Sequence, residues 1–157
     1  MWVVRYIEPR LLHAARTRPA VVLTGARQTG KTATLRRLFP SHRFVSLDLP
    51  SEAELAENQP GVFLDRYAPP VVIDEVQHAP ALFRHLKTAI DGRRHECGQF
   101  LLTGSQKFTL MAGVSDSLAG RVDVEELETL SWREIHEATP TASVEAAVVR
   151  GGFPELH

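Results

Sequence analysis

GARQTGKT, residues 25–32, is the stretch that decides the fold of this chain. It fits the pattern G-x-x-x-x-G-K-[ST], in which backbone N–H groups and the start of the following helix surround phosphate oxygens. The pattern places Lys31 at the β- and γ-phosphates and the Thr32 hydroxyl on Mg²⁺. The expected nucleotide-binding residues are Gly25, Ala26, Arg27, Gln28, Thr29, Gly30, Lys31 and Thr32. A glycine-containing turn before a surface helix is the alternative.

The residues on either side of this loop favour phosphate binding over a simple turn. Residues 20–23 form a short apolar run, rich in β-branched side chains, that is typical of a buried strand. Residues 31–39 continue as a helix, which Pro40 ends. A strand, a loop and a helix in this order are the context that the motif requires.

VVIDE, residues 71–75, is the second informative stretch. Three β-branched residues run into two carboxylates, which describes a buried strand with an acidic carboxyl end. Because ligands bind outside the carboxyl ends of parallel strands, we expect Asp74 and Glu75 to lie near the loop. Asp74 would hold Mg²⁺, and Glu75 would orient or deprotonate an attacking water. The alternative is a strand that simply ends in solvated acids.

Further strands and helices alternate along the rest of the chain. The alternation predicts an α/β domain of the phosphate-loop class, with five strands in a parallel sheet and helices on both faces. Strands are expected at 43–49, 99–103 and 122–127. Helices are expected at 5–17, 51–57 with a Ser51–Glu54 capping box, 61–67, 80–91, 107–119, 132–137 capped by Ser131, and 142–150.

Two further positions carry weaker predictions. Ser105 or Gln106, at the end of the fourth strand, would reach the γ-phosphate or the water, although polar residues end most strands. Arg121 precedes the fifth strand and would stabilise transition-state charge as an arginine finger. A surface arginine that pairs with Asp123 or Glu125 is an equal alternative.

Composition excludes several classes of protein. With 157 residues, 43% of them hydrophobic, the chain is long enough for one folded domain with a core. The net charge of -1 gives no general attraction to nucleic acid or to an anionic membrane. The single cysteine excludes an intrachain disulfide. Neither a membrane span nor a signal peptide is evident, so a soluble cytoplasmic protein is expected.

Several motifs occur together in an order that resembles one known family. The chain is similar to the N-terminal module of a prokaryotic family of AAA+ ATPases, in which a C-terminal domain of uncharacterised function follows. The resemblance implies the sheet order 5-1-4-3-2. It also implies that Lys31 and Thr32 are Walker A residues and that Asp74 and Glu75 are the Walker B pair. Ser105 then corresponds to sensor 1, and Arg121 to a finger that acts in the same or a neighbouring subunit. The motifs are GARQTGKT, SLDLPSEAEL, VVIDEVQHAP, LLTGSQKF, SLAGRV and GGFPE.

The same resemblance implies one AAA+-type ATP-binding domain over residues 1–157. Residues 1–18 would be an N-terminal helix, 19–130 the core, and 131–157 a truncated C-terminal helical segment. The implied function is Mg²⁺-dependent ATP binding and hydrolysis coupled to a client, either protein or DNA, with self-association possible. The alternatives are a nucleotide-binding module with little turnover and, less favoured, a small-molecule kinase. ATP is preferred to GTP because no guanine-reading segment is evident, and residues 6–9 would contribute to the adenine pocket.

Overall fold

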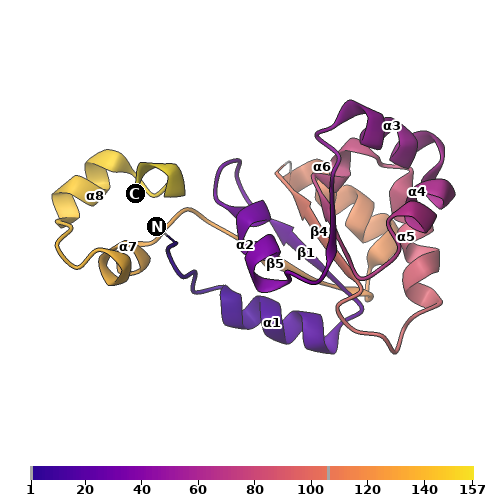
Figure 1. The fold of residues 1–157 in the computed structure, drawn as a ribbon, viewed down its shortest axis with the longest axis horizontal. Coiled ribbons are helices and arrows are strands. Elements are labelled where there is room, and N and C mark those ends of the chain that lie inside the picture. The colour runs from indigo at the N-terminus through magenta and orange to yellow at the C-terminus, as the bar shows by residue number, and fades with distance from the viewer. Residues whose placement is uncertain (1, 106) are drawn as a thin grey trace.

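Five short parallel strands run through the centre of the molecule (Figure 1). The computed structural model describes residues 2–105 and 107–157. The sheet order is β2-β3-β4-β1-β5, which confirms the predicted order 5-1-4-3-2 and the phosphate-loop α/β class. The strands are β1 (Ala20–Thr24), β2 (Arg43–Ser46), β3 (Val71–Asp74), β4 (Phe100–Gly104) and β5 (Val122–Glu126).

The central strands are apolar because helices cover both of their faces. Every residue of β1, β3 and β4 is buried. Side chains alternate along a strand, so Val21 and Leu23 enter one core, while Ala20 and Val22 enter the other. A continuous apolar run is therefore the expected pattern for these strands.

Two helices cover one face of the sheet and the remaining core helices cover the other (Figure 1). Leu11 and Leu35 bring α1 and α2 onto the first face. On the second face, Phe63, Leu86 and Leu110 are fully buried. The first face carries α1 (Glu8–Thr17) and α2 (Lys31–Leu38). The second carries α3 (Pro50–Asn58), α4 (Pro60–Arg66), the 3₁₀ turn η1 (Val76–His78), α5 (Leu82–Asp91), α6 (Lys107–Gly113) and the π-helical turn η2 (Val114–Leu118).

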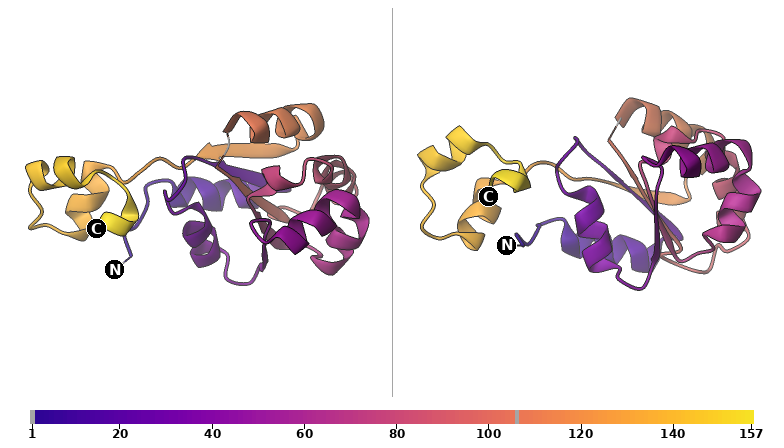
Figure 2. Two further views of the ribbon diagram at one scale, coloured as in Figure 1. Left: turned by 90° about the horizontal axis from the view of Figure 1, so that it is seen from above. Right: turned by 45° about the horizontal axis from the view of Figure 1, so that its top comes forward.

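The C-terminal helices form a separate group beside the sheet, close to the N-terminal segment (Figure 2). This group holds α7 (Trp132–Ala138), α8 (Val144–Arg150) and the 3₁₀ turn η3 (Pro154–Leu156). Ser131 caps α7 as predicted, in a full capping box with Glu134. None of the residues of α8 is buried.

The sequence-based boundaries need several corrections. The helix expected at 5–17, within an N-terminal helix of residues 1–18, begins only at Glu8. The helices expected at 80–91 and 142–150 begin at Leu82 and Val144. The second strand ends at Ser46 rather than at residue 49. The helix expected at 51–57 begins at Pro50, and no side chain caps it, so the Ser51–Glu54 capping box was wrong. Proline suits the first helical position because it has no N–H to satisfy there, and it moved the helix start upstream.

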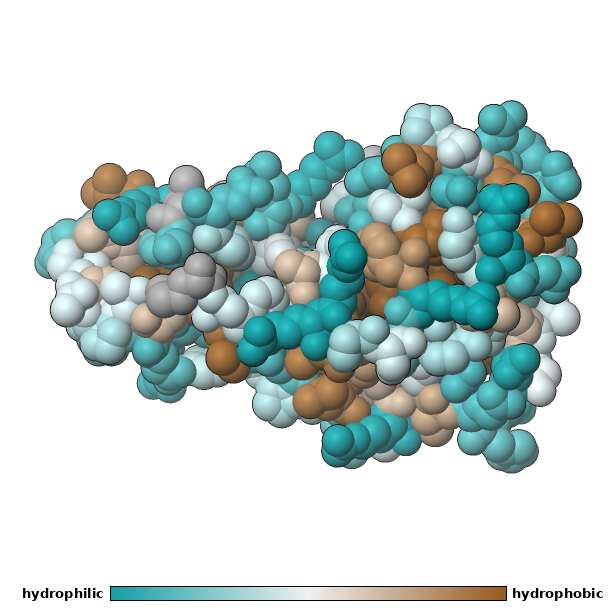
Figure 3. All heavy atoms as spheres, viewed as in Figure 1, coloured by the Kyte–Doolittle hydropathy of each residue, from teal (hydrophilic) through white to brown (hydrophobic). Residues whose placement is uncertain are grey.

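Hydrophilic side chains dominate the face drawn in Figure 3, and the hydrophobic ones lie in small groups. Over the described residues, no helix is both long and apolar enough to cross a membrane.

The centre of the sheet gives a stability prediction. Leu102 is fully buried and pairs with Val22 on one side and Ile73 on the other. Leu102→Ala is expected to lower the free energy of unfolding by roughly 2–5 kcal/mol, because it removes buried methyl groups and leaves a cavity. Val148→Ala, in which the parent side chain is 76% exposed, is the control, with a change below about 0.5 kcal/mol. Urea unfolding followed by circular dichroism measures both, and similar losses would contradict this assignment of the core.

Candidate functional site

The loop of residues 25–32 connects β1 to α2 in a backbone conformation that requires glycine at its start. Gly25 has φ 144°, and an added Cβ would lie 2.1 Å from the carbonyl oxygen of Leu127. Gln28 and Gly30 also have positive φ, of 63° and 93°. Gly30 is the N-cap of α2. The loop therefore ends at a helix N-terminus, where unpaired N–H groups favour an anion.

A cleft of about 580 Å³ opens over this loop. It brings together most of the loop residues that the sequence predicts and the carboxylate of Glu75. Asp48, from the segment after β2, also lines it and was not predicted. The lining residues are Arg27, Gln28, Gly30, Lys31, Thr32, Ala33, Asp48 and Glu75.

The Lys31 side chain folds back onto the first residues of the loop. Its ammonium donates to the carbonyl oxygens of Gly25 (3.0 Å) and Ala26 (2.8 Å). Burial lowers the pKa of Lys31, while the carboxylates of Glu75 and Asp74 oppose that shift. The cation is thus held among loop carbonyls and beside two acids, at the floor of the cleft.

The Asp74 carboxylate collects three hydroxyl groups at the carboxyl edge of the sheet. Its Oδ1 accepts from Thr32 Oγ1 (2.7 Å) and Thr103 Oγ1 (2.6 Å), and its Oδ2 accepts from Ser46 Oγ (3.2 Å). Hydroxyl and carboxylate oxygens suit Mg²⁺, which proteins hold with one or two carboxylates together with substrate phosphates and water. The described residues contain no group of three or more His, Cys, Asp or Glu side chains that could hold a metal by themselves.

Glu75 follows Asp74 in a left-handed conformation, with φ 54°. Its Oε2 accepts from Gln77 Nε2 (2.5 Å), from the Ser105 amide (3.1 Å) and from Ser105 Oγ (2.8 Å). Burial acts to raise the pKa of Glu75, but these hydrogen bonds and the charge of Lys31 together lower it below its usual value. Glu75 is therefore ionised at neutral pH and available as a proton acceptor.

The structure thus places Ser105 beside Glu75, while Gln106 lies outside the described residues. Sequence reasoning missed Thr103 and Gln77, which hold the two acids in place. Thr103 Oγ1 also accepts from the Glu75 amide (3.0 Å). The available signal was a threonine in an otherwise apolar buried strand, because a buried hydroxyl needs a partner.

Arg121 does not join this site within one chain. It precedes Val122, which pairs with Ala20 at the start of β1, whereas the loop follows Thr24 at the end of that strand. At about 3.3 Å per residue, four residues of strand separate the two by roughly 13 Å or more. Its guanidinium makes two hydrogen bonds to Asp91, of 2.8 and 3.0 Å.

The partner expected for a surface Arg121 was therefore wrong as well. It is Asp91 rather than Asp123 or Glu125, and Glu125 pairs with Arg10 at 2.7 Å.

A parallel α/β sheet of this order, with a glycine-rich loop at a helix N-terminus, defines the phosphate-loop nucleotide-binding class. Residues 17–136 match the AAA domain family. The chain belongs to this family.

Comparison with known proteins agrees with that assignment. The chain is 36% identical over 149 residues to uncharacterised proteins of Mycobacterium tuberculosis and Mycobacterium bovis, a match that includes 92% of this chain. It spans about a third (32%) of the length of those relatives.

Solved structures share the fold at low sequence identity. A Walker-type ATPase of Pyrococcus abyssi has a TM-score of 0.64 at 14% identity, covering 98% of this chain and 65% of its own. A RuvB variant of Thermotoga maritima has a TM-score of 0.56 at 20% identity, covering 83% of this chain and 47% of its own. Cdc6p of Pyrobaculum aerophilum has a TM-score of 0.54 at 14% identity, covering 87% and 50%.

The hydroxyls at the sheet edge give a second prediction. Thr103→Val removes the group that joins Asp74 to the Glu75 amide, leaving buried partners unsatisfied, so we expect a loss of about 1–3 kcal/mol in the free energy of unfolding. Thr24→Val is the matched control, because Thr24 is a buried strand residue whose Oγ1 has no partner among the described residues. Its free energy of unfolding is expected to stay the same or rise. Chemical denaturation without nucleotide compares the two, and equal effects would contradict the role of Thr103.

Proposed function

We propose that this domain binds ATP with Mg²⁺ and hydrolyses its γ-phosphate bond. One observation carries the proposal. Lys31, Thr32 and the carboxylate of Glu75 line one cleft over a phosphate-type loop, and the adjacent carboxylate of Asp74 accepts from the Thr32 hydroxyl at its edge. Membership of the AAA domain family supports nucleotide binding.

The loop and α2 would bind the phosphates. Backbone amides of residues 27–32 and the ammonium of Lys31 would face the phosphates, and Thr32 and Asp74 would hold Mg²⁺. The metal, when bound, neutralises charge on the β- and γ-phosphates. Phosphate oxygens compete well for Lys31, whose present acceptors are neutral carbonyls.

Glu75 would accept the proton of the attacking water. Its lowered pKa keeps it in the basic form, and its contacts with Gln77 and Ser105 fix the direction of the carboxylate. Both contacts occupy Oε2, and no described contact uses Oε1. We assign Oε1 to the water and Ser105 to orienting Glu75.

The adenine base would occupy a hollow behind the loop. Trp2, Val3, Leu130 and Pro154 line this hollow next to Gly30. Residues 6–9, which the sequence suggested for the adenine pocket, do not line this hollow, and the Tyr6 hydroxyl contacts Glu137 instead. The hollow has a volume of about 80 Å³, so its lining side chains would have to move apart to admit the base of a nucleotide whose phosphates lie in the cleft.

A nucleotide-binding module with little turnover is the second candidate. The observation that favours it is the position of Arg121, which is paired with Asp91 on the opposite edge of the sheet. A single chain then lacks that charge at the γ-phosphate. Coupling to a protein or DNA client would be a property of the longer protein, and self-association would be the way to supply the arginine.

Glu75→Gln tests hydrolysis. We expect phosphate release from Mg²⁺-ATP to fall by about 10²–10⁴-fold, because the amide cannot accept the proton. Binding of Mg²⁺-ATP, measured by calorimetry, should change little. Glu54→Gln, an exposed acid on α3, is the control and should keep the parent rate. If the parent protein releases no more phosphate than Glu75→Gln, the hydrolase proposal is wrong. If phosphate instead appears on an added acceptor, the protein is a kinase.

Arg121→Ala tests a finger supplied by a neighbouring copy. If Arg121 acts between subunits, the parent rate per molecule rises with protein concentration, and the variant loses about 10³-fold or more of the rate at high concentration. Arg94→Ala is the control, since Arg94 also pairs with Asp91 but lies in another loop. A rate per molecule that is independent of concentration, or equal in both variants, argues against the finger.

A further inference from the structure

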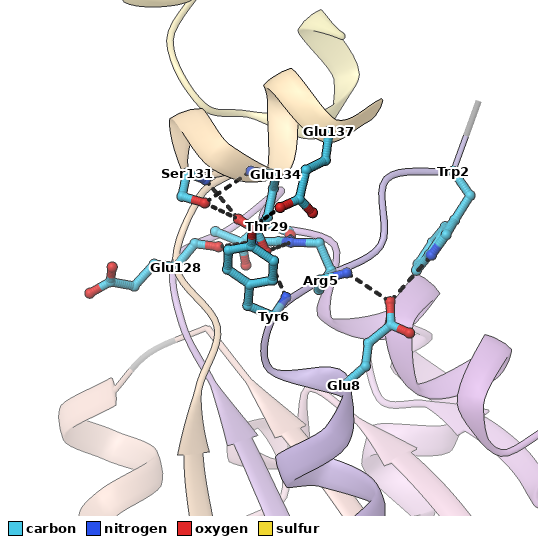
Figure 4. A network of polar contacts seen from close by, with 9 residues as sticks. All are labelled: Trp2, Arg5, Tyr6, Glu8, Thr29, Glu128, Ser131, Glu134 and Glu137. Carbon is cyan, nitrogen blue, oxygen red and sulfur yellow. Dashed lines mark hydrogen bonds and ion pairs between the residues drawn. The ribbon is translucent and has the colours of Figure 1, made fainter. Parts of the chain in front are cut away.

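Arg5 is a buried arginine that touches three separate elements at once (Figure 4). It lies in the extended segment before α1, and it is 4% exposed. Its Nη1 donates to the carbonyl of Thr29 (2.8 Å), its Nη2 to the carbonyl of Glu128 (2.8 Å), and its Nε to Glu134 (3.1 Å). Fully buried arginines are rare, and they persist only where every charge is paired.

The contact with Thr29 bears on the phosphate-type loop itself. Thr29 is fully buried between two residues of positive φ, Gln28 and Gly30. In a planar trans peptide the carbonyl of Thr29 and the N–H of Gly30 point in opposite directions. A guanidinium that holds this carbonyl therefore also fixes the direction of the Gly30 N–H, which belongs to the set expected to face phosphate.

Arg5 also lies directly behind the loop. An added Cβ at Gly30 would lie 3.9 Å from Arg5 Nη1 and 3.8 Å from Pro154. Gly30 lines both the cleft and the hollow that Arg5 borders. One residue of the loop thus separates Arg5 from the space proposed for the phosphates.

The other end of the network is α7. The Glu134 carboxylate accepts from Arg5 and from the Tyr6 amide (2.9 Å) on Oε1, and from the Ser131 amide (2.7 Å) and hydroxyl (2.8 Å) on Oε2. Burial opposes ionisation of Glu134, but these donors together lower its pKa, so the carboxylate stays charged. One side chain both caps α7 and holds Arg5, and a movement of α7 therefore moves the guanidinium.

We propose that Arg5 is a positioning residue for the nucleotide-binding loop, and that it links the position of α7 to the conformation of the Thr29–Gly30 peptide. The effect of Arg5 on nucleotide affinity rests on the proposed function, whereas its effect on the conformation of the loop does not. A purely structural ion pair would stabilise the whole domain alike, and this difference makes the proposal testable.

Arg5→Lys and Glu134→Gln separate the contacts. Lysine keeps a positive charge beside Glu134, but it lacks the planar fork that reaches Thr29 and Glu128 together. Glutamine preserves the capping box of α7, which accepts Glu or Gln, and removes only the charge that anchors Arg5. Arg10→Lys is the matched control, because the Arg10–Glu125 pair also joins the N-terminal region to the sheet but does not touch the loop.

The first measurement is hydrogen exchange of the nucleotide-free protein, with thermal unfolding recorded for each variant. Amides of residues 25–32 should exchange about tenfold faster in Arg5→Lys, and less so in Glu134→Gln, as expected for loss of a charged hydrogen bond. Exchange in β4 and α5 should be unchanged, and Arg10→Lys should match the parent in the loop. Unchanged loop exchange, or equal acceleration throughout the domain, would overturn the proposal.

The second measurement is the affinity for Mg²⁺-ADP by calorimetry, at a temperature where every variant is folded. Arg5→Lys should bind about tenfold more weakly, while Arg10→Lys should bind like the parent. Parent-like affinity in Arg5→Lys would overturn the proposal. If the parent itself binds no nucleotide, the proposed function fails, and the exchange experiment still decides the role of Arg5.

Discussion

A buried carboxylate organises the carboxyl edge of this sheet. Asp74 is 5% exposed, and a carboxylate in that position is stable only when donors surround it. Its donors come from β2, β4 and the first turn of α2, so the ends of three strands and one helix are tied to one charge. Thr103 extends the same arrangement to the backbone of Glu75, and it thereby sets where the second acid begins. The geometry of the cleft therefore depends on several strand ends and on α2 together, not on the loop alone.

Charges at the two edges of the sheet have different environments. At the carboxyl edge, Lys31 and Glu75 are partly desolvated and act on each other's pKa. At the amino edge, Arg121 and Asp91 form a solvent-accessible pair. One chain thus holds the residues that we propose bind phosphate and activate water, while the arginine proposed to neutralise transition-state charge points elsewhere. That division suits a domain whose activity depends on a neighbour.

Contiguous features were predictable from the sequence, and long-range ones were not. The loop, the acids at and just after the end of β3, and the helix cap at Ser131 each depend on residues a few positions apart, and the sequence pattern predicted them. The sheet order came from family resemblance, because strand alternation fixes no order. Arg5 gave no signal, since its partners lie 24, 123 and 129 residues away. The predicted Ser51 cap was wrong because the helix begins at Pro50. Glu75 could be identified from the sequence, but its hydrogen-bond partners could not.

The placement of both termini has a practical consequence. Trp2 and Pro154 line the same hollow beside Gly30, so the two ends of the described chain converge behind the loop (Figure 2). An affinity tag fused at either end would emerge next to the space that we assign to the base. A polyhistidine tag there also brings metal-binding imidazoles close to a candidate Mg²⁺ site. Preparations for nucleotide titrations should therefore have their tags cleaved, and an internal label on α5 would report on the domain from a safer distance.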